Sequence, residues 1–396
     1  MMLNEPTSAR NLRRLLGLSA LLGLLVSPSQ VWAQRADSRS VEARVVEAVC
    51  DKQVVLLGEL PSHGEARGFQ AKARIVELLV DRCGFDAVLF EAAIYDFLGF
   101  HEALAAGRAA PLQLDRAIGG FWWTRELADW RRWLFRQATA GRLVLGGLDD
   151  QVSATSHYAR ATLPGLVAAS SPAGSASECR QAVERNLHWR YDDAGQRFDE
   201  PERIRLQRCA RLAADALAGR AGRGAGTPER VMAENLASFF DRQRGSPGAR
   251  DRDEVMYRNL LWHRGRMPRG SKLIVWTATV HAARQQGARR EKPLGAWLAD
   301  RWGDRVAVIG FSAFAGQSSR AGTPSQPLPQ APPGSLEALA TGADTALAFL
   351  DRAALRRIGS APSRLFGSFT SADWSALFDG VVVVREEVAP TFEERR

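Results

Sequence analysis

The sequence predicts an α/β protein in which helices flank a central, mostly parallel sheet, with an inserted or adjoining helical lobe. Two observations lead to this prediction. Short runs rich in Val and Leu alternate with amphipathic helical stretches, the order that builds a parallel sheet. Residues 155–265 differ, because they are helical in pattern, rich in Arg and Ala, and interrupted by Gly/Ser/Pro loops.

The first half of the α/β core is expected over residues 34–154. Trp123, Leu127, Trp130 and Leu134 recur at helical spacing and are expected to face the core, with Thr124 as the N-cap. The expected elements are, in order, helix 40–50, strand 54–57, helix 68–82, strand 87–90, helix 98–106, a helix that follows Thr124 within the segment 118–138, and strand 143–146.

The second half of the core is expected over residues 266–396, with strands at 273–276, 305–311 and 380–386 and a helix at 292–302. Within it, residues 316–335 are rich in Pro, Ser and Gly. Such a composition predicts a long, mobile loop.

Residues 1–33 are expected to form a secretory signal peptide. Three arginines precede an apolar run over residues 15–26, and Ala33 ends a segment suited to cleavage. The run is too short to span a bilayer comfortably, although an uncleaved anchor is the alternative. We therefore expect a periplasmic or secreted protein without stable membrane insertion after cleavage.

The four cysteines fit this location. An even count in an oxidising compartment favours disulfides, and none of the four has a zinc-binding spacing. Cys50 and Cys83 end neighbouring helices, and Cys179 and Cys209 lie in one helical segment. We expect the pairs Cys50–Cys83 and Cys179–Cys209; the alternative is four buried thiols.

The positive charge says little about partners. The net charge is +9, and removing residues 1–33 takes away three Arg and one Glu, which leaves 9 − 3 + 1 = +7. The arginines are scattered among acidic residues at helical spacing, as on an ordinary solvated surface. No basic face with interleaved aromatic residues occurs, so no nucleic-acid partner is expected.

Polar side chains follow four strand-like runs. The run VVLLGELPSHGE brings Glu59, His63 and Glu65, while Glu91 and Asp149 end the next two runs and His281 follows the fourth. In parallel sheets, ligands bind outside the carboxyl ends of the strands. A Glu and a His at that edge supply general acid–base chemistry or metal ligands.

The residues in this order resemble the erythromycin esterase family. The matching blocks are GELPSHGEARGF with the following KARIVELLVDRCGFDAVLFEAAIYDF, WWTRELADWRRWL, GGLDDQ, RDEVMYRNLLW and VWTATVHAAR, from about residue 54 to 311. The resemblance implies an α/β fold with a helical lobe and a cleft. It also implies hydrolysis of a small-molecule ester by His-activated water, without a covalent enzyme intermediate. We expect no cofactor. In the named members of the family the ester is a macrolide lactone, hence an association with antibiotic resistance.

The resemblance also implies roles for particular residues. His63 matches the general base, Glu59 the Glu of its motif, Arg74 the basic residue of the next helix and His281 a late histidine; Glu65 is added as a second carboxylate near His63. These five form the expected catalytic set. Glu91, Asp149 and Trp123 are expected to bind substrate.

Alternatives remain open for several of these residues. Glu59 and Glu91 could pair with Arg74 or Arg67 structurally, and Asp149 could cap a helix. The sequence departs from the family's pattern in two blocks: Ala278 and Thr279 replace a His and an Asn, and Arg67 stands where an acidic residue is usual. A non-catalytic relative that binds a ligand, a metal or haem is therefore the rival hypothesis. No serine-hydrolase elbow and no HExxH occurs, and no metal ligands are assigned.

Overall fold

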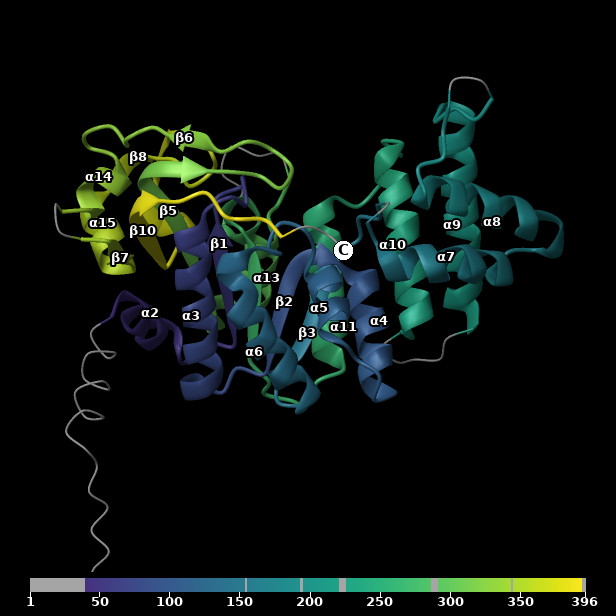
Figure 1. The fold of residues 1–396 in the computed structure, drawn as a ribbon, viewed down its shortest axis with the longest axis horizontal. Helices are drawn as coiled ribbons and strands as arrows, with labels where there is room; N and C mark the ends of the chain where they lie inside the picture. Colours follow the sequence, from purple (N-terminus) through teal and green to yellow (C-terminus); the bar gives the residue numbers. More distant parts are fainter. Residues whose placement is uncertain are drawn as a thin grey trace, which may run out of the picture. The chain divides into compact units, whose positions relative to one another are not determined.

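The computed structural model describes residues 40–153, 155–192, 195–220, 226–285, 291–342 and 345–393, so the expected signal peptide lies outside the described residues. Within these ranges an eight-stranded sheet has the order β3-β2-β4-β1-β5-β10-β7, with β6 paired to β5 (Figure 1). The strands are β1 Val54–Glu59, β2 Ala87–Ala93, β3 Val144–Asp149, β4 Leu273–Ala278, β5 Val306–Ser318, β6 Gln326–Leu328, β7 Leu347–Asp351, β8 Ser360–Ser363, β9 Thr370–Asp373 and β10 Gly380–Glu387.

The strands from β3 to β10 pair in parallel, and only the β10–β7 and β5–β6 pairs in this sheet are antiparallel; β8 and β9 form a separate ladder. The helices are α2 Val41–Val49, α3 Ala66–Cys83, α4 Ile94–Ala105, α5 Pro111–Ile118, α6 Ala128–Thr139, α7 His157–Ser170, α8 Ala173–Leu187, α9 Glu200–Arg220, α10 Pro228–Gln243, α11 Arg252–Gly265, α12 Thr279–Ala282, α13 Leu294–Trp302, α14 Leu336–Ala340, α15 Arg352–Ile358 and α16 Trp374–Leu377, with 3-10 turns at Arg125–Leu127 and Gly303–Arg305.

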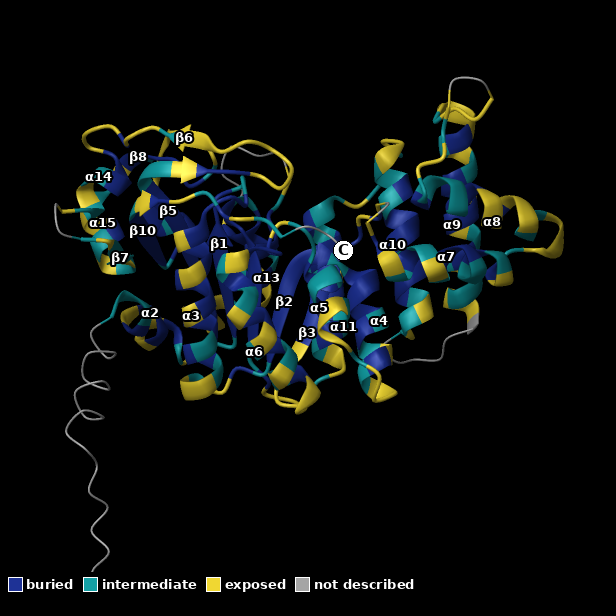
Figure 2. Cartoon of the chain, in the orientation of Figure 1, coloured by how far each residue is buried: buried dark blue, intermediate teal, exposed yellow. Residues whose placement is uncertain are grey.

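Helices bury both faces of the sheet. In β1, Val55 and Leu57 pack into a core shared with α2, α3 and α6, while Val54 and Leu56 pack into a second core shared with α11 and α13. All six residues of β1 are buried (Figure 2). A parallel strand covered on both faces is apolar throughout, which explains why the run VVLL does not alternate with polar residues. The predicted α/β architecture is confirmed.

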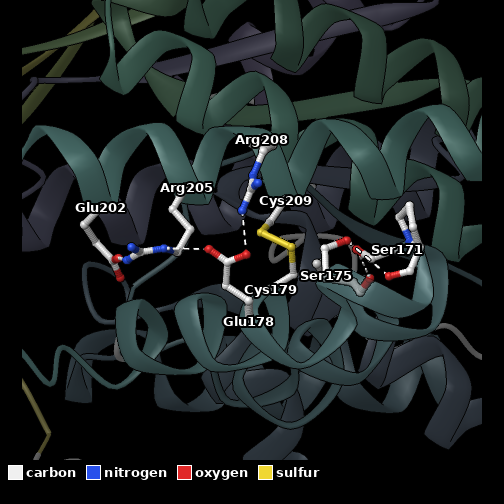
Figure 3. Close-up of a disulfide and its surroundings, with 10 residues drawn as sticks. Ser171, Ser175, Glu178, Cys179, Glu202, Arg205, Arg208 and Cys209 are labelled. Carbon is white, nitrogen blue, oxygen red and sulfur yellow. Dashed lines mark hydrogen bonds and ion pairs between the residues drawn. A yellow bond between two sulfur atoms is a disulfide. The ribbon is translucent and has the colours of Figure 1, made fainter.

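The helical segment has its own core. Helices α7 to α10 bury a third apolar cluster against α4, whereas α11 contributes Met256 and Leu260 to a core under the sheet. The predicted disulfides are both present, Cys50–Cys83 and Cys179–Cys209. The second joins α8 to α9 beside Glu178, which accepts hydrogen bonds from Arg205 at 3.0 Å and Arg208 at 2.6 Å (Figure 3).

Side chains cover the carbonyls of β3, the strand at one end of the sheet. His101 of α4 bonds the carbonyl oxygen of Leu145 at 2.6 Å, and His263 of α11 bonds that of Gly147 at 3.0 Å. Asn259 of α11 donates to the carbonyl oxygen of Leu148 at 2.7 Å. The edge strand therefore has hydrogen-bond partners without a further strand.

Two predicted elements differ from the structure. The helix expected after Thr124 begins as a 3-10 turn at Arg125–Leu127 and becomes α-helical only from Ala128, and the Thr124 side chain makes no capping hydrogen bond. Leu127, Trp130 and Leu134 are nevertheless buried as expected. The segment 316–335 is not a featureless loop: β5 runs on to Ser318 and pairs with β6. Among the described residues, no helix is both long and apolar enough to cross a membrane.

Candidate functional site

The carboxyl ends of four adjacent strands bring the predicted polar residues to one edge. The strands β3, β2, β4 and β1 are neighbours in that order and are parallel, and they end near Asp149, Glu91, Ala278 and Glu59. His281 lies on α12, directly after β4. The chain winds away from β1 in one direction through β2 and in the other through β5, and such a reversal opens a crevice at the strand ends.

Glu59 lies at the centre of the first half of this site and is buried. Its Oε1 accepts a hydrogen bond from Nε1 of Trp122 at 2.9 Å and lies 2.9 Å from Nδ1 of His63. Its Oε2 contacts Nζ of Lys72, which also donates to the carbonyl oxygen of Thr277 at 3.2 Å. The carboxylate fixes the proton of His63 on Nδ1 and leaves the lone pair on Nε2.

The loop that carries His63 is tightly constrained. His63 has a φ of 51°, a left-handed conformation that a non-glycine residue adopts at a cost. A Cβ on Gly64 would lie 2.3 Å from the carbonyl oxygen of Ser319, so this position requires glycine. Glu65 accepts hydrogen bonds from the hydroxyls of Ser62 and Ser318 and from the backbone N–H of Gly64. Glu65 thus fastens the loop to the end of β5 and does not itself bond His63.

His281 forms the second carboxylate–imidazole pair. Its Nδ1 contacts Oδ1 of Asp253, and its Nε2 lies 3.3 Å from Oε1 of Glu91 and 3.0 Å from Nη1 of Arg252. Arg252 also binds Oδ2 of Asp149, with Nη2 at 2.5 Å and Nε at 3.0 Å. The other oxygen of Glu91 accepts from the hydroxyl of Thr277 at 2.7 Å and the backbone N–H of Ala278 at 2.8 Å.

The pKa values of His63 and His281 are shifted in opposite directions. Burial lowers the pKa of His63, with only partial compensation from Glu91 and Glu65. Burial also opposes protonation of His281, yet Glu91 and Asp253 raise the pKa of that imidazole to about 9. Burial alone would raise the pKa of Glu91, but His281 and Arg252 hold it well below its usual range. Near neutral pH, the site therefore contains one neutral and one protonated imidazole.

A cavity of about 460 Å³ is lined by residues that contact the two histidines, although neither histidine nor its paired carboxylate, Glu59 or Asp253, is part of the lining. Phe121 and Trp122 line it, and their rings contact the imidazole of His63 at centroid distances of 4.8 and 5.5 Å. Glu91, Asp149 and Arg252 provide its charged wall, and the remaining lining includes Asp96, Arg116, Gln151, Ser153, Thr155, Ser156, Phe239 and Gln243. The cavity offers aromatic, hydroxyl, amide and ionic contacts to a small molecule.

Three predictions do not match this geometry. Arg74 lies on the exposed face of α3, where its Nη1 is 3.1 Å from Oε2 of Glu77, and the buried base of that helix is Lys72. Trp123 is buried outside the cavity lining, and the indole that reaches Glu59 belongs to Trp122. Arg67 uses its side chain on the carbonyl oxygen of Glu386, while its backbone N–H donates to Glu387. In the first two cases the residue that reaches Glu59 lies two positions and one position earlier in the chain.

The structure adds three residues that the sequence did not single out, Lys72, Arg252 and Asp253, and of the adjacent pair Trp122 and Trp123 it places Trp122 in the cavity lining. Lys72 had a signal, since a lone Lys on an otherwise apolar helical face must be paired when buried. Arg252 and Asp253 stand in the block RDEVMYRNLLW but lie more than 100 positions from Asp149 and Glu91. Within the described ranges, no three His, Cys, Asp or Glu side chains are arranged to hold a metal ion.

Comparisons with known proteins agree on the fold. The structure is similar to a Bacillus cereus protein (TM-score 0.64, 18% identity, 91% of this chain and 93% of that one), and to a protein named for succinoglycan biosynthesis (0.63, 16%, 88% and 92%). It is also similar to a mutant of the erythromycin esterase EreC in its open conformation (0.61, 16%, 87% and 93%). No curated protein matches the sequence. The sequence pattern of the erythromycin esterase family matches residues 80–387, so the chain belongs to the erythromycin esterase family.

Proposed function

We propose that this protein hydrolyses a small-molecule ester or lactone with water activated by His63. Membership of the erythromycin esterase family supports a hydrolase-like function. The single observation that supports the mechanism is the 2.9 Å contact between Nδ1 of His63 and Oε1 of Glu59, inside a site that Trp122 and Lys72 complete. A buried carboxylate behind an imidazole is the standard arrangement for a general base.

The base step uses the neutral form of His63. Nε2 takes a proton from water, and the water oxygen attacks the carbonyl carbon, whose electrons move to the carbonyl oxygen. Glu59 stabilises the imidazolium that forms, because its carboxylate lies 2.9 Å from Nδ1 of His63. No bond between the enzyme and the substrate is needed.

The acid step uses the protonated form of His281. When the tetrahedral intermediate collapses, the C–O bond of the ester breaks and the leaving alkoxide takes a proton from Nε2 of His281. Arg252, which lines the same cavity, adds a fixed positive charge near the developing oxyanion. This role replaces the one expected for Arg74, which lies on the exposed face of α3.

The cavity supports a substrate that carries a cationic group. Three carboxylates, Glu91, Asp96 and Asp149, line it against two guanidinium groups, Arg116 and Arg252, which leaves one carboxylate in excess. A macrolide with an amino sugar has this chemistry, and its hydrolysis would confer antibiotic resistance. We also propose a periplasmic or secreted location, with which the two disulfides are compatible.

The test is a panel of macrolides and simple carboxylic esters, assayed by mass spectrometry for addition of one water. The wild type should hydrolyse at least one class, and His63→Ala should lose roughly 100- to 10,000-fold in kcat. His188→Ala is the matched control, because this histidine lies at the end of α8 and bonds Arg160. A variant His63→Ala as active as the wild type would overturn the mechanism.

A second candidate function is ligand binding without turnover. It is favoured by one observation: Ala278 and Thr279 have taken the places of a His and an Asn, and Ala278 offers only a backbone N–H to Glu91. Protection of the wild type against thermal unfolding by a macrolide, with no hydrolysis over a day, would establish this alternative in place of the enzyme.

A further inference from the structure

Asp253, near the start of α11, is a buried carboxylate with one partner. Its Oδ1 contacts Nδ1 of His281, and the side chain is only 2% exposed. Its Oδ2 is buried and has no hydrogen-bond partner among the residues that the structure describes. A buried charge in this situation is stable only when its partner is a cation. The carboxylate therefore favours the protonated imidazole and keeps a proton on Nδ1.

The other nitrogen of His281 has a partner in each of its protonation states. Nε2 lies 3.0 Å from Nη1 of Arg252 and 3.3 Å from Oε1 of Glu91. A guanidinium only donates hydrogen bonds, so a protonated Nε2 must donate to Glu91 and an unprotonated Nε2 accepts from Arg252. Nε2 itself therefore has a hydrogen-bond partner both with and without its proton.

We propose that Asp253 is a positioning residue that fixes the Nδ1 proton of His281, so that Nε2 is the atom that releases and regains the proton in ester hydrolysis. This inference rests on the proposed function, because it assigns the proton donor of the same site. The alkoxide takes the Nε2 proton as the ester C–O bond breaks. The proton that His63 removed from water passes to solvent, and solvent returns one to Nε2 of His281.

Among the residues that the structure describes, four charged or titratable groups act on His281 directly or through Glu91. Asp253 and Arg252 face it from α11, Glu91 faces it from β2, and His63 acts on Glu91 from the loop after β1. Glu91 and Asp253 both favour the imidazolium, and they raise the pKa of His281 to about 9. Asp253 is the one that binds Nδ1, so its removal should change the tautomer as well as the proton affinity.

The test is a titration of the full-length chain labelled with ¹⁵N-histidine, with His281→Gln to assign the resonance. In the wild type at pH 7.5, both nitrogens of His281 should be protonated. Asp253→Asn should lower the pKa of His281 by roughly one to two units, and Asp253→Glu should recover part of the loss. The matched control is Asp251→Asn, the same change two residues earlier, where the side chain caps α11 through the backbone N–H of Glu254.

The titration needs no substrate, so it separates this inference from the proposed hydrolysis. An unchanged pKa in Asp253→Asn, or a neutral wild-type His281 with its proton on Nε2, would overturn the positioning role even if esters are hydrolysed. A shift in Asp253→Asn but not in Asp251→Asn would support it even if no ester is found. If Asp253→Asn does not fold, the wild-type tautomer alone decides.

Discussion

Nη2 of Arg252 lies 2.9 Å from Oε1 of Glu91, although the two residues are 161 positions apart. The same nitrogen lies 2.5 Å from Oδ2 of Asp149. One guanidinium therefore joins the first residue of α11 to the ends of β2 and β3. It also neutralises two carboxylates that would otherwise repel each other at the floor of the cavity.

Replacing Arg252 should destabilise the protein as well as the site. Arg252→Met leaves Glu91 and Asp149 close together without their shared cation, and we expect a loss of about 2 kcal/mol in the free energy of unfolding, measured in urea. Arg258→Met is the control on the same helix, because its exposed pair with Glu254 should contribute less than about 0.5 kcal/mol. Equal losses in the two variants would contradict the bridging role.

Lys72 should matter for the same electrostatic reason on the other side of the site. Lys72→Met leaves Glu59 buried with only the neutral donors Trp122 and His63, and we expect a loss of about 3 kcal/mol in unfolding free energy together with reduced turnover. Lys52→Met, which removes a surface pair with the exposed Asp51, should change stability by less than about 0.5 kcal/mol. Wild-type stability in Lys72→Met would show that Glu59 does not need this cation.

Hydrolysis should depend on pH with two limbs. Burial lowers the pKa of His63, so the base stays neutral until the pH falls below about 6.5, its unperturbed value. His281 loses its proton near pH 9, because its pKa is raised to about 9. The rate should form a plateau between these values, and His281→Gln should lose the alkaline limb while keeping the acid one. A profile that still declines near pH 9 in His281→Gln would contradict the assignment of the acid.

His263 should make stability depend on pH. Burial lowers its pKa to about 3, so the His263 imidazole stays neutral in the folded protein between pH 6.5 and 3. In the unfolded chain the same imidazole takes up a proton below pH 6.5. Stability is therefore lost as pH falls from 6.5 towards 3. Between pH 6.5 and 4.5, the wild type should lose about 2 kcal/mol more than His263→Gln. This difference isolates His263 from Asp96 and Asp150, whose raised pKa values act in the opposite direction.

The disulfide Cys179–Cys209 should stabilise the helical segment selectively. It closes a loop of 30 residues, for which we expect about 3 kcal/mol. In a variant with both cysteines changed to Ala, amide exchange should speed up in α8 and α9 but not in β1 or β4. Uniform acceleration across the sheet would show that the segment and the sheet unfold together.

The sequence predicted the strand ends well because each apolar run stops at a polar residue. Glu59, Glu91 and Asp149 reach one edge as expected, and so does His281. The partners of these residues could not be predicted in the same way. Arg252 and Asp253 lie on a helix whose polar residues look solvated in the sequence, and only the packing of α11 against β3 turns two of them inward. The sequence also did not reveal which basic residue of α3 faces the site. Arg74 and Lys72 are two positions apart and therefore lie on opposite faces of the helix, and the buried one is Lys72.

The three side-chain contacts to β3 have a consequence beyond folding. An uncovered terminal strand offers its free backbone groups to a strand of another molecule, which is how many proteins begin to aggregate. His101, Asn259 and His263 occupy carbonyls that such an incoming strand would need. When the protein loses stability below pH 6.5, unfolding would separate these side chains from the β3 carbonyls. The carbonyls could then pair with a strand of another molecule, so acid stress should produce self-association as well as loss of structure.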